Sequence, residues 1–97
     1  MTDKALCEYL KQYRRGQESA ASSKELEAVF HIKGTELRRA VNRLRCSGYP
    51  ICSDATGYFY AARPSEISAT IAQLTGRISK IAAAKNGLLK SYQEKEE

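Results

Sequence analysis

The sequence changes its apolar spacing once, around Gly48 and Pro50. Upstream, apolar residues recur three and four positions apart, as on the buried face of a helix. A glycine just past the last apolar residue, followed closely by a proline, is a strong signal that a helix ends. Downstream, the pattern predicts two short strands, 50–53 and 58–61, with the turn-forming residues 54–57 between them. We therefore expect a mainly helical fold with one small β-hairpin.

Three helices are predicted before the hairpin, over residues 3–15, 23–30 and about 34–47. Ser22 and Glu25 have the spacing of a capping box at the start of the second helix, and Thr35 can cap the third. Two short helices joined by a tight turn, the second more basic than the first, are typical of a helix-turn-helix. The residues expected to face the core from these two helices are Leu26, Val29, Phe30, Leu37, Ala40, Val41 and Leu44.

The position of the hairpin, directly after the third helix, makes the prediction more specific. Three helices followed by a hairpin predict a winged helix-turn-helix domain over residues 1–63, in which the hairpin is the wing. A lone hairpin is barely stable in water, so it should pack against the helices. Strand alternation places Tyr58 and Tyr60 on one face. We expect these rings to pack in the core rather than to form a platform on which bases stack.

Positive charge is concentrated on the predicted third helix. The whole chain of 97 residues carries 16 Lys and Arg against 11 Asp and Glu, a net charge of +5. From Lys33 to Arg45 there are five bases and a single acid, Glu36. Such a stripe favours a polyanionic partner, through electrostatic steering and the release of counterions. A solvated helix face can carry the same charge, so a surface that binds protein remains an alternative.

Helical geometry selects the candidate contacts with double-stranded DNA. An exposed helix fits the major groove of B-form DNA, where Arg pairs with guanine and Asn with adenine. The residues left on the exposed side that we expect to face the groove are Thr35, Arg38, Arg39 and Asn42. The residues that we expect to contact phosphates are Arg43, Arg45, Lys33 and Lys24.

Several short motifs fall in the order of a known family. They are Ser22-Ser23-Lys24-Glu25-Leu26, the basic helix ending in Leu44-Arg45, Gly48-Tyr49-Pro50-Ile51, and Gly57-Tyr58-Phe59-Tyr60. Over about residues 20 to 61 the chain resembles the winged helix of the biotin repressor N-terminal domain and related small bacterial and phage regulators. The resemblance implies a winged helix-turn-helix that binds DNA. It does not extend to a biotin-ligase domain, so biotin chemistry is not implied.

The tip of the predicted wing departs from the basic wing that the family uses against DNA. Residues 53–57 carry one acid, Asp54, and no base. The resemblance therefore does not imply a wing contact with phosphate here. Arg63, just past the second strand, is the nearest cation that could substitute.

Residues 64–97 predict a long C-terminal helix for self-association, with Ser65 as its N-cap and a frayed tail over residues 93–97. Its apolar residues alternate four and three positions apart, which is the seam of a coiled coil. A second copy of the same helix is the simplest partner, so we expect a homodimer. The alternative is that the helix folds back on the first helix, against Leu6, Leu10 and Tyr13. The seam residues are Ile67, Ile71, Leu74, Ile78, Ile81 and Leu88.

Catalytic and metal sites are not indicated. Cys7, Cys46, Cys52 and the single histidine, His31, lack the paired spacing of metal ligands. The sequence has no glycine-rich phosphate loop, no paired carboxylates on one face and no nucleophile beside a base. We therefore expect no enzyme activity, no metal, no cofactor and no small-molecule ligand.

The sequence also bears on the compartment. No segment approaches the roughly 18 consecutive apolar residues of a membrane span. The first residues, 1–4, open a polar segment without the apolar core of a signal peptide. We expect a cytoplasmic protein without a membrane partner.

The favoured interpretation is a dimeric transcriptional regulator that binds double-stranded DNA in a sequence-specific manner. One alternative is a DNA-binding component of a phage or plasmid replication or packaging assembly, in which the C-terminal helix builds a larger oligomer. Another is a winged-helix module that binds protein. A salt-dependent shift on duplex DNA and the mass of the oligomer would distinguish them.

Overall fold

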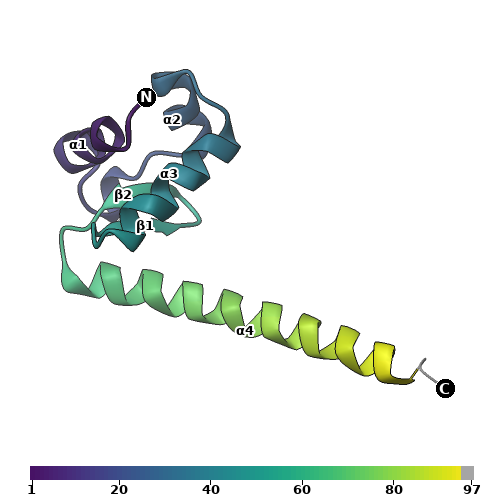
Figure 1. The fold of residues 1–97 in the computed structure, drawn as a ribbon. Helices are drawn as coiled ribbons and strands as arrows, with labels where there is room; N and C mark the ends of the chain where they lie inside the picture. Colours follow the sequence, from purple (N-terminus) through teal and green to yellow (C-terminus); the bar gives the residue numbers. More distant parts are fainter. Residues whose placement is uncertain (95–97) are drawn as a thin grey trace.

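The computed structural model describes residues 1–94 and has two parts of different shape (Figure 1). The elements, in chain order, are α1 (Asp3–Tyr13), a 3-10 helix (Gln17–Ser19), α2 (Ser23–Phe30), α3 (Gly34–Cys46), β1 (Ile51–Asp54), β2 (Gly57–Tyr60) and α4 (Pro64–Glu94). Helices α1 to α3 and the hairpin gather into a head, which we define as residues 1–63, and α4 projects from it as a long rod. A mainly helical chain with a small hairpin and a long C-terminal helix is thus confirmed.

Helix α1 ends two residues earlier than the sequence predicts. Arg14 and Arg15 leave the helix because the backbone there pairs with β2. The N–H of Tyr60 donates to the carbonyl of Arg14 over 2.8 Å, and the N–H of Gly16 donates to the carbonyl of Tyr60 over 2.8 Å. These tertiary hydrogen bonds replace the last helical ones that the local sequence favours.

The starts of α2 and α3 differ in how they are capped. The capping box at α2 is confirmed, because the Ser22 side chain accepts from the N–H of Glu25 and the Glu25 side chain accepts from the N–H of Ser22. Thr35 was expected to cap α3 but does not, because the helix already begins at Gly34 with Lys33 as its N-cap. His31 adopts a left-handed conformation, with φ of 53°, which lets the chain turn quickly and start α3 early.

The hairpin is antiparallel, with Ile51 opposite Tyr60 and Asp54 opposite Gly57, so residues 55 and 56 form its tip. Both strands begin or end within a residue or so of the predicted positions. The segment before α2 covers the outer edge of β2. The N–H of Ala21 donates to the carbonyl of Tyr58 over 2.9 Å, and the N–H of Tyr58 donates to the carbonyl of Ala21 over 2.8 Å. The hairpin is therefore held between the chain before α2 and the rest of the head.

The core lies where α1, α2 and α3 meet the inner face of the hairpin. Tyr58 and Tyr60 are half-buried against it, as expected. Val29 was expected to face the core but is 46% exposed, because α2 packs through Leu26 and Phe30 and Val29 lies at the edge of that side of the helix. A smaller cluster around Cys52 and Phe59 lies on the opposite face of the hairpin. The residues buried most deeply in the main core are Leu6, Leu10, Ala21, Leu26, Leu37 and Ala40.

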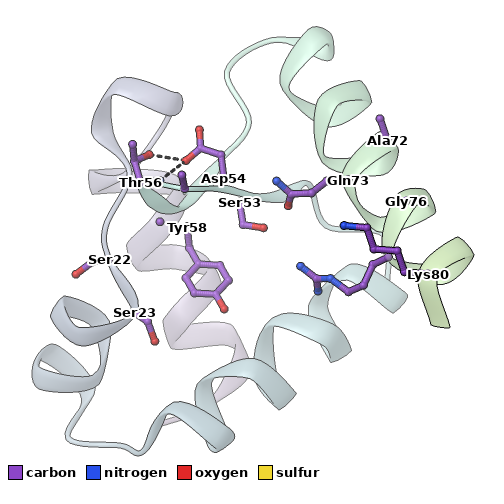
Figure 2. Close-up of a pocket in the computed structure, with 13 residues that line it drawn as sticks. Ser22, Ser23, Ser53, Asp54, Thr56, Tyr58, Ala72, Gln73, Gly76 and Lys80 are labelled. Atoms are coloured by element: carbon purple, nitrogen blue, oxygen red, sulfur yellow. Dashed lines mark hydrogen bonds between the residues drawn. The ribbon is translucent and has the colours of Figure 1, made fainter. Parts of the chain in front are cut away.

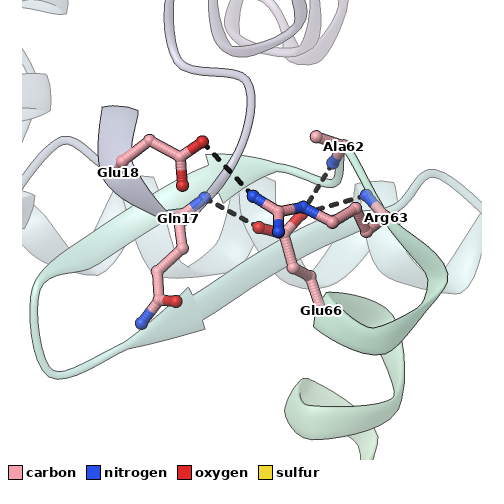
Figure 3. A network of polar contacts seen from close by, with 5 residues as sticks. All are labelled: Gln17, Glu18, Ala62, Arg63 and Glu66. Atoms are coloured by element: carbon pink, nitrogen blue, oxygen red, sulfur yellow. Dashed lines mark hydrogen bonds and ion pairs between the residues drawn. The ribbon is translucent and has the colours of Figure 1, made fainter.

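The start of α4 is fixed to the head by the carboxylate of Glu66 (Figure 3). This carboxylate accepts hydrogen bonds from three backbone N–H groups, those of Gln17 (2.9 Å), Ala62 (2.7 Å) and Arg63 (3.1 Å). Arg63 in turn pairs with Glu18. Ser65 does not act as the N-cap that was expected, because the helix already begins at Pro64. The Glu66 side chain instead bonds the N–H groups of the two residues just before the helix, Ala62 and Arg63.

Beyond its anchored first turns, α4 extends away from the head (Figure 1). The side chains of Ile71, Ile78 and Ile81 are 57%, 67% and 64% exposed. Leu6 and Leu10 are buried inside the head, so the alternative in which α4 folds back on α1 is wrong. Of the tail that was expected to fray, residues 93 and 94 are helical, and 95–97 lie outside the described residues.

Candidate nucleic-acid interface

The exposed face of α3 is the surface that the sequence singled out. Leu37, Ala40, Val41 and Leu44 are all buried, as predicted, and they occupy one side of the helix. A helix with 3.6 residues per turn therefore presents its opposite side to solvent. The four residues predicted to face a DNA groove are exposed on this surface: Thr35, Arg38, Arg39 and Asn42.

Arg38 and Arg39 carry charge that the head does not neutralise. No salt bridge within residues 1–94 involves either guanidinium. Arg38 lies across the start of its own helix, because its Nη1 atom is 3.3 Å from where a Cβ on Gly34 would be. The Glu27 carboxylate is equally close to that point, but it accepts a hydrogen bond from Ser23 over 2.8 Å instead.

Arg43 is exposed, as expected, but its charge is already paired. Its Nε and Nη2 atoms donate to the two carboxylate oxygens of Asp3, over 2.8 and 2.9 Å. The hydrogen bond from Arg43 lowers the pKa of Asp3 below its ordinary value, so both groups are charged at neutral pH. This pair joins α3 to the start of α1, on the side of α3 away from the hairpin.

Arg45 was expected on the exposed surface, but it is half-buried. Its Nε donates to the carbonyl of Ile51 over 2.8 Å, and its Nη2 donates to the Ser53 hydroxyl over 3.0 Å. Burial lowers the pKa of this guanidinium. Arg45 is half-buried because it lies on the side of α3 that faces β1, where the strand carbonyls need hydrogen-bond donors.

The two lysines of the predicted phosphate contacts are exposed at neighbouring helix starts. Lys33 is the N-cap of α3, and Lys24 lies in the first turn of α2. Neither forms a salt bridge within the described part of the chain. Helix N-termini carry partial positive charge, so these lysines add to a field that already attracts anions.

The acid next to the hairpin tip, Asp54, accepts hydrogen bonds on its carboxylate oxygens. Asp54 accepts hydrogen bonds from the N–H of Thr56 over 2.8 Å and from the side chain of Gln17 over 2.6 Å. Hydrogen bonds from Thr56 lower the pKa of Asp54, so its carboxylate stays charged. The tip is thus a closed, negatively charged turn, which agrees with the absence of a basic wing in the sequence.

A cleft of about 840 Å³ lies between the start of α2, the hairpin and α4 (Figure 2). Sequence reasoning missed it, because it depends on the direction in which α4 leaves the head. Gln73 and Lys80 project from α4 toward the hairpin residues Ser53 and Tyr58. Arg77 also lines the cleft. This surface places two α4 bases across the cleft from the hairpin and the start of α2.

The predicted seam residues lie along the rod of α4. Ile67, Ile71, Ile78, Ile81 and Leu88 are exposed, the last by 73%, and Leu74 is half-buried. Leu89 and Tyr92 are also exposed and extend the apolar surface toward the C-terminal end of the helix. An apolar stripe of this length has no partner within the described chain.

Likeness to known proteins assigns no role to these residues. Comparison of the chain with models of protein families, with curated proteins and with solved structures found no match. Within residues 1–94, no helix combines the length and apolar character needed to cross a membrane. The same residues contain no group of three or more His, Cys, Asp or Glu placed to hold a metal ion.

Proposed function

We propose that this protein binds double-stranded DNA in a sequence-specific manner, with a winged helix-turn-helix head that inserts α3 into the major groove. The observation that carries the proposal is the exposed face of α3. It presents Arg38, Arg39 and Asn42 together, and no acid within the described chain pairs with either arginine. Leaving two cations unpaired on one short helix face suits a polyanion better than it suits plain solvent.

The side chains on this face have the chemistry of direct base readout. Arg38 and Asn42 are one turn apart, so both can point along the floor of a groove. Arg donates two parallel hydrogen bonds to guanine, and Asn bonds adenine through its amide. Lys33 and Lys24, at the starts of α3 and α2, are placed to contact phosphates on either side. The pairing of Arg43 with Asp3 and the partial burial of Arg45 make both weaker candidates for phosphate contact.

The order of the elements supports the winged helix-turn-helix interpretation. Helices α2 and α3 are separated only by residues 31–33, and the hairpin follows α3 after a short connection. The segment before α2 pairs with β2, so the hairpin is held against the head beside α3. A rigid hairpin next to an exposed basic helix is the arrangement that such domains use on DNA.

We further propose that α4 pairs with α4 of a second copy, so that the protein acts as a dimeric transcriptional regulator. The seam from Ile67 to Leu88 is exposed in the single chain, and burying it would remove a large apolar surface from water. Two copies related by a twofold axis would read a DNA site with the same symmetry.

A larger oligomer is the second candidate, and the residues of the seam are partly those of three- or four-stranded coils. In heptad positions, Ile71 and Ile78 with Leu74 suit a two-stranded coil, whereas Ile67 and Ile81 at the same positions as Leu74 suit three or four strands. A larger assembly would fit a component of a phage or plasmid replication or packaging complex. Sedimentation equilibrium separates a dimer from a trimer or tetramer by mass.

The test of DNA binding is fluorescence anisotropy of a labelled random duplex between about 50 and 200 mM salt. We expect affinity to weaken steeply with salt, and selection from a random pool should then yield a preferred site. The variant Arg38→Ala with Arg39→Ala should lose about 1–3 kcal/mol of discrimination for each base contact removed. The control, Lys11→Ala with Lys90→Ala, removes the same charge from exposed positions on α1 and α4.

Two results would contradict the proposal. The first is equal affinity and equal salt dependence in the arginine double variant and the wild type. The second is the absence of binding at the lowest salt, which would assign the basic face to a protein partner.

A further inference from the structure

We propose that α4 is itself part of the DNA-binding surface, with Arg77 and Lys80 contacting the phosphate backbone beside the hairpin. This inference rests on the proposed function and extends it to residues outside the head. It arises from three features: the cleft between the hairpin and α4, the charges that line it, and the rigid anchor of α4.

The cleft places the two bases opposite the hairpin and the start of α2. It runs from Ser22 and Ser23 at the start of α2, across Tyr58, to Arg77 and Lys80 on α4 (Figure 2). The cleft is open to solvent, so a strand backbone can lie along it. A duplex whose backbone follows the cleft would therefore meet α4 across from the hairpin.

Arg38 is linked to one wall of this cleft through residues of α2. The Ser23 hydroxyl, which lines the cleft, donates to Glu27 over 2.8 Å. The Glu27 carboxylate and the Arg38 guanidinium both lie over Gly34. Arg38 therefore lies close to Glu27, which accepts a hydrogen bond from a residue of the cleft wall.

The charges in the cleft are not balanced within the described chain. Arg77 and Lys80 form no salt bridge within residues 1–94. Asp54, on the hairpin side of the cleft, is negatively charged and is the one acid among the described residues that lines the cleft beside these two bases. Two unpaired cations on one wall would be stabilised by an anion between them and the hairpin.

The neighbourhood of Arg45 shows the same imbalance. Burial lowers the pKa of Arg45, and the positive charge of Arg77 contributes to the lowering. The two positive charges repel each other. A phosphate group in the cleft would reduce this repulsion, whereas further cations or neutral groups would not.

The orientation of α4 is fixed close to these bases. The Glu66 carboxylate accepts hydrogen bonds from three backbone N–H groups of the head. The buried hydroxyl of Thr70 accepts a hydrogen bond from the N–H of Ser53 over 3.4 Å. Arg77 follows Thr70 by two helical turns, so it lies on the side of α4 that faces the hairpin. The backbone that carries Arg77 is thus held close to the hairpin by these contacts.

Arg77 borders the dimer seam, about 40° round the helix from Ile81, whereas Lys80 lies about 100° from Ile81 and outside the seam. Seven residues make two turns, so Thr70 and Arg77 share a side, and Lys80 lies further round from the seam. Ile71 and Ile78 lie about a quarter of a turn away in the opposite sense. Self-association through the seam therefore leaves Lys80 free to reach DNA.

An α4 contact also accounts for the unusual hairpin tip. Residues 53–57 contain no base, so the tip cannot neutralise the phosphates that pass beside it. Arg77 and Lys80, on the other side of the cleft, supply the missing positive charge. They would act where a basic wing would otherwise act.

The experiment measures anisotropy of the same labelled duplex, between about 50 and 200 mM salt, with the full chain. The variant Arg77→Ala with Lys80→Ala should bind more weakly, and the slope of log affinity against log salt should fall by about 0.9 for each lost phosphate contact. The control Lys11→Ala with Lys90→Ala should keep the wild-type slope, because neither lysine lines the cleft. The variant Arg77→Lys, which keeps the positive charge, should also keep the wild-type slope.

The titrations distinguish a role of α4 in DNA binding from the role of α3. Wild-type binding with equal slopes in the cleft variant and the control would overturn the role of α4 and leave the role of α3 intact. No binding by the wild type would overturn both. Circular dichroism and sedimentation should show the same helix content and mass for all variants, because the substituted side chains are exposed.

Discussion

Arg43 and Asp3 form a two-pronged ion pair that ties the basic helix to the start of the chain, with N–O distances of 2.8 and 2.9 Å. The flat guanidinium of arginine matches the two oxygens of a carboxylate, which gives the pair a defined geometry. The pair holds α3 against α1 at the surface. It also withholds from DNA one of the arginines that the sequence offers as a phosphate contact.

Removing the Asp3 carboxylate should therefore strengthen DNA binding. In Asp3→Asn the Arg43 guanidinium is released, and we expect the slope of log affinity against log salt to become steeper by about 0.9, as for one added phosphate contact. The control is Glu8→Gln, which removes one negative charge from an exposed position on the same helix. An equal effect of both substitutions in the anisotropy titration would show that only net charge matters.

The hydrogen bonds of Glu66 predict a pH-dependent anchor for α4. Bonds from the N–H groups of Gln17 and Ala62 lower the pKa of Glu66 below its ordinary value of 4.5. A carboxyl with a lowered folded-state pKa stabilises the fold fully above its unfolded pKa, and this contribution is lost as pH falls through the folded value. Glu66→Gln should thus be less stable than the wild type at pH 7, and the difference should shrink in acid.

Urea unfolding of both proteins at a series of pH values measures that difference. Glu8→Gln serves again as the control, because Glu8 has no hydrogen-bond partner among residues 1–94. A gap between wild type and Glu66→Gln that stays constant down to pH 3 would contradict a role for the charged carboxylate.

Gly57 lies where the chain before α2 presses on the hairpin. Its φ is +139°, and a Cβ there would stand 2.1 Å from the carbonyl oxygen of Ala21. Gly57→Ala should destabilise the head by more than the roughly 1–3 kcal/mol of an unfavourable backbone conformation, because that backbone must also move. Gly48→Ala is the matched control, since Gly48 has a φ of +94° and open space around it. Equal losses for the two substitutions in urea unfolding would exclude the close approach.

Local sequence signals predicted the parts of the fold that local interactions decide. The capping box of Ser22 and Glu25 set the start of α2, and the apolar spacing of Leu37 and Leu44 gave the buried side of α3. The stop at Gly48 separated the helices from the hairpin. The face of α3 that carries Arg38 followed from the same spacing.

The errors occur where distant segments meet. Arg15 leaves α1 because β2 pairs with the backbone beside it, and no feature of residues 3–15 announces that partner. Arg45 is drawn toward β1 by the carbonyl of Ile51, which only the folded hairpin brings near. The cleft likewise depends on the angle of α4, which Glu66 sets through bonds to the head.

The exposed seam of α4 predicts how the protein associates. Ile78 is 67% exposed in the single chain, so replacing it should leave the head and the helix folded. An aspartate in the middle of a paired seam would be buried without a partner, at a cost of several kcal/mol for each charge. We therefore expect Ile78→Asp to be a monomer at tens of micromolar in sedimentation equilibrium, where the wild type is a dimer or larger.

The neighbouring substitution Ser79→Asp isolates the effect of position. It places the same charge on the same exposed helix, but outside the seam, because adjacent residues of a helix point about 100° apart. Ser79→Asp should keep the mass of the wild type. Equal masses for both variants and the wild type would mean that the stripe of Ile71, Ile78 and Ile81 does not join copies of this chain. DNA binding by the Ile78→Asp monomer should then be compared at equal head concentration, because loss of the second head lowers affinity without touching α3.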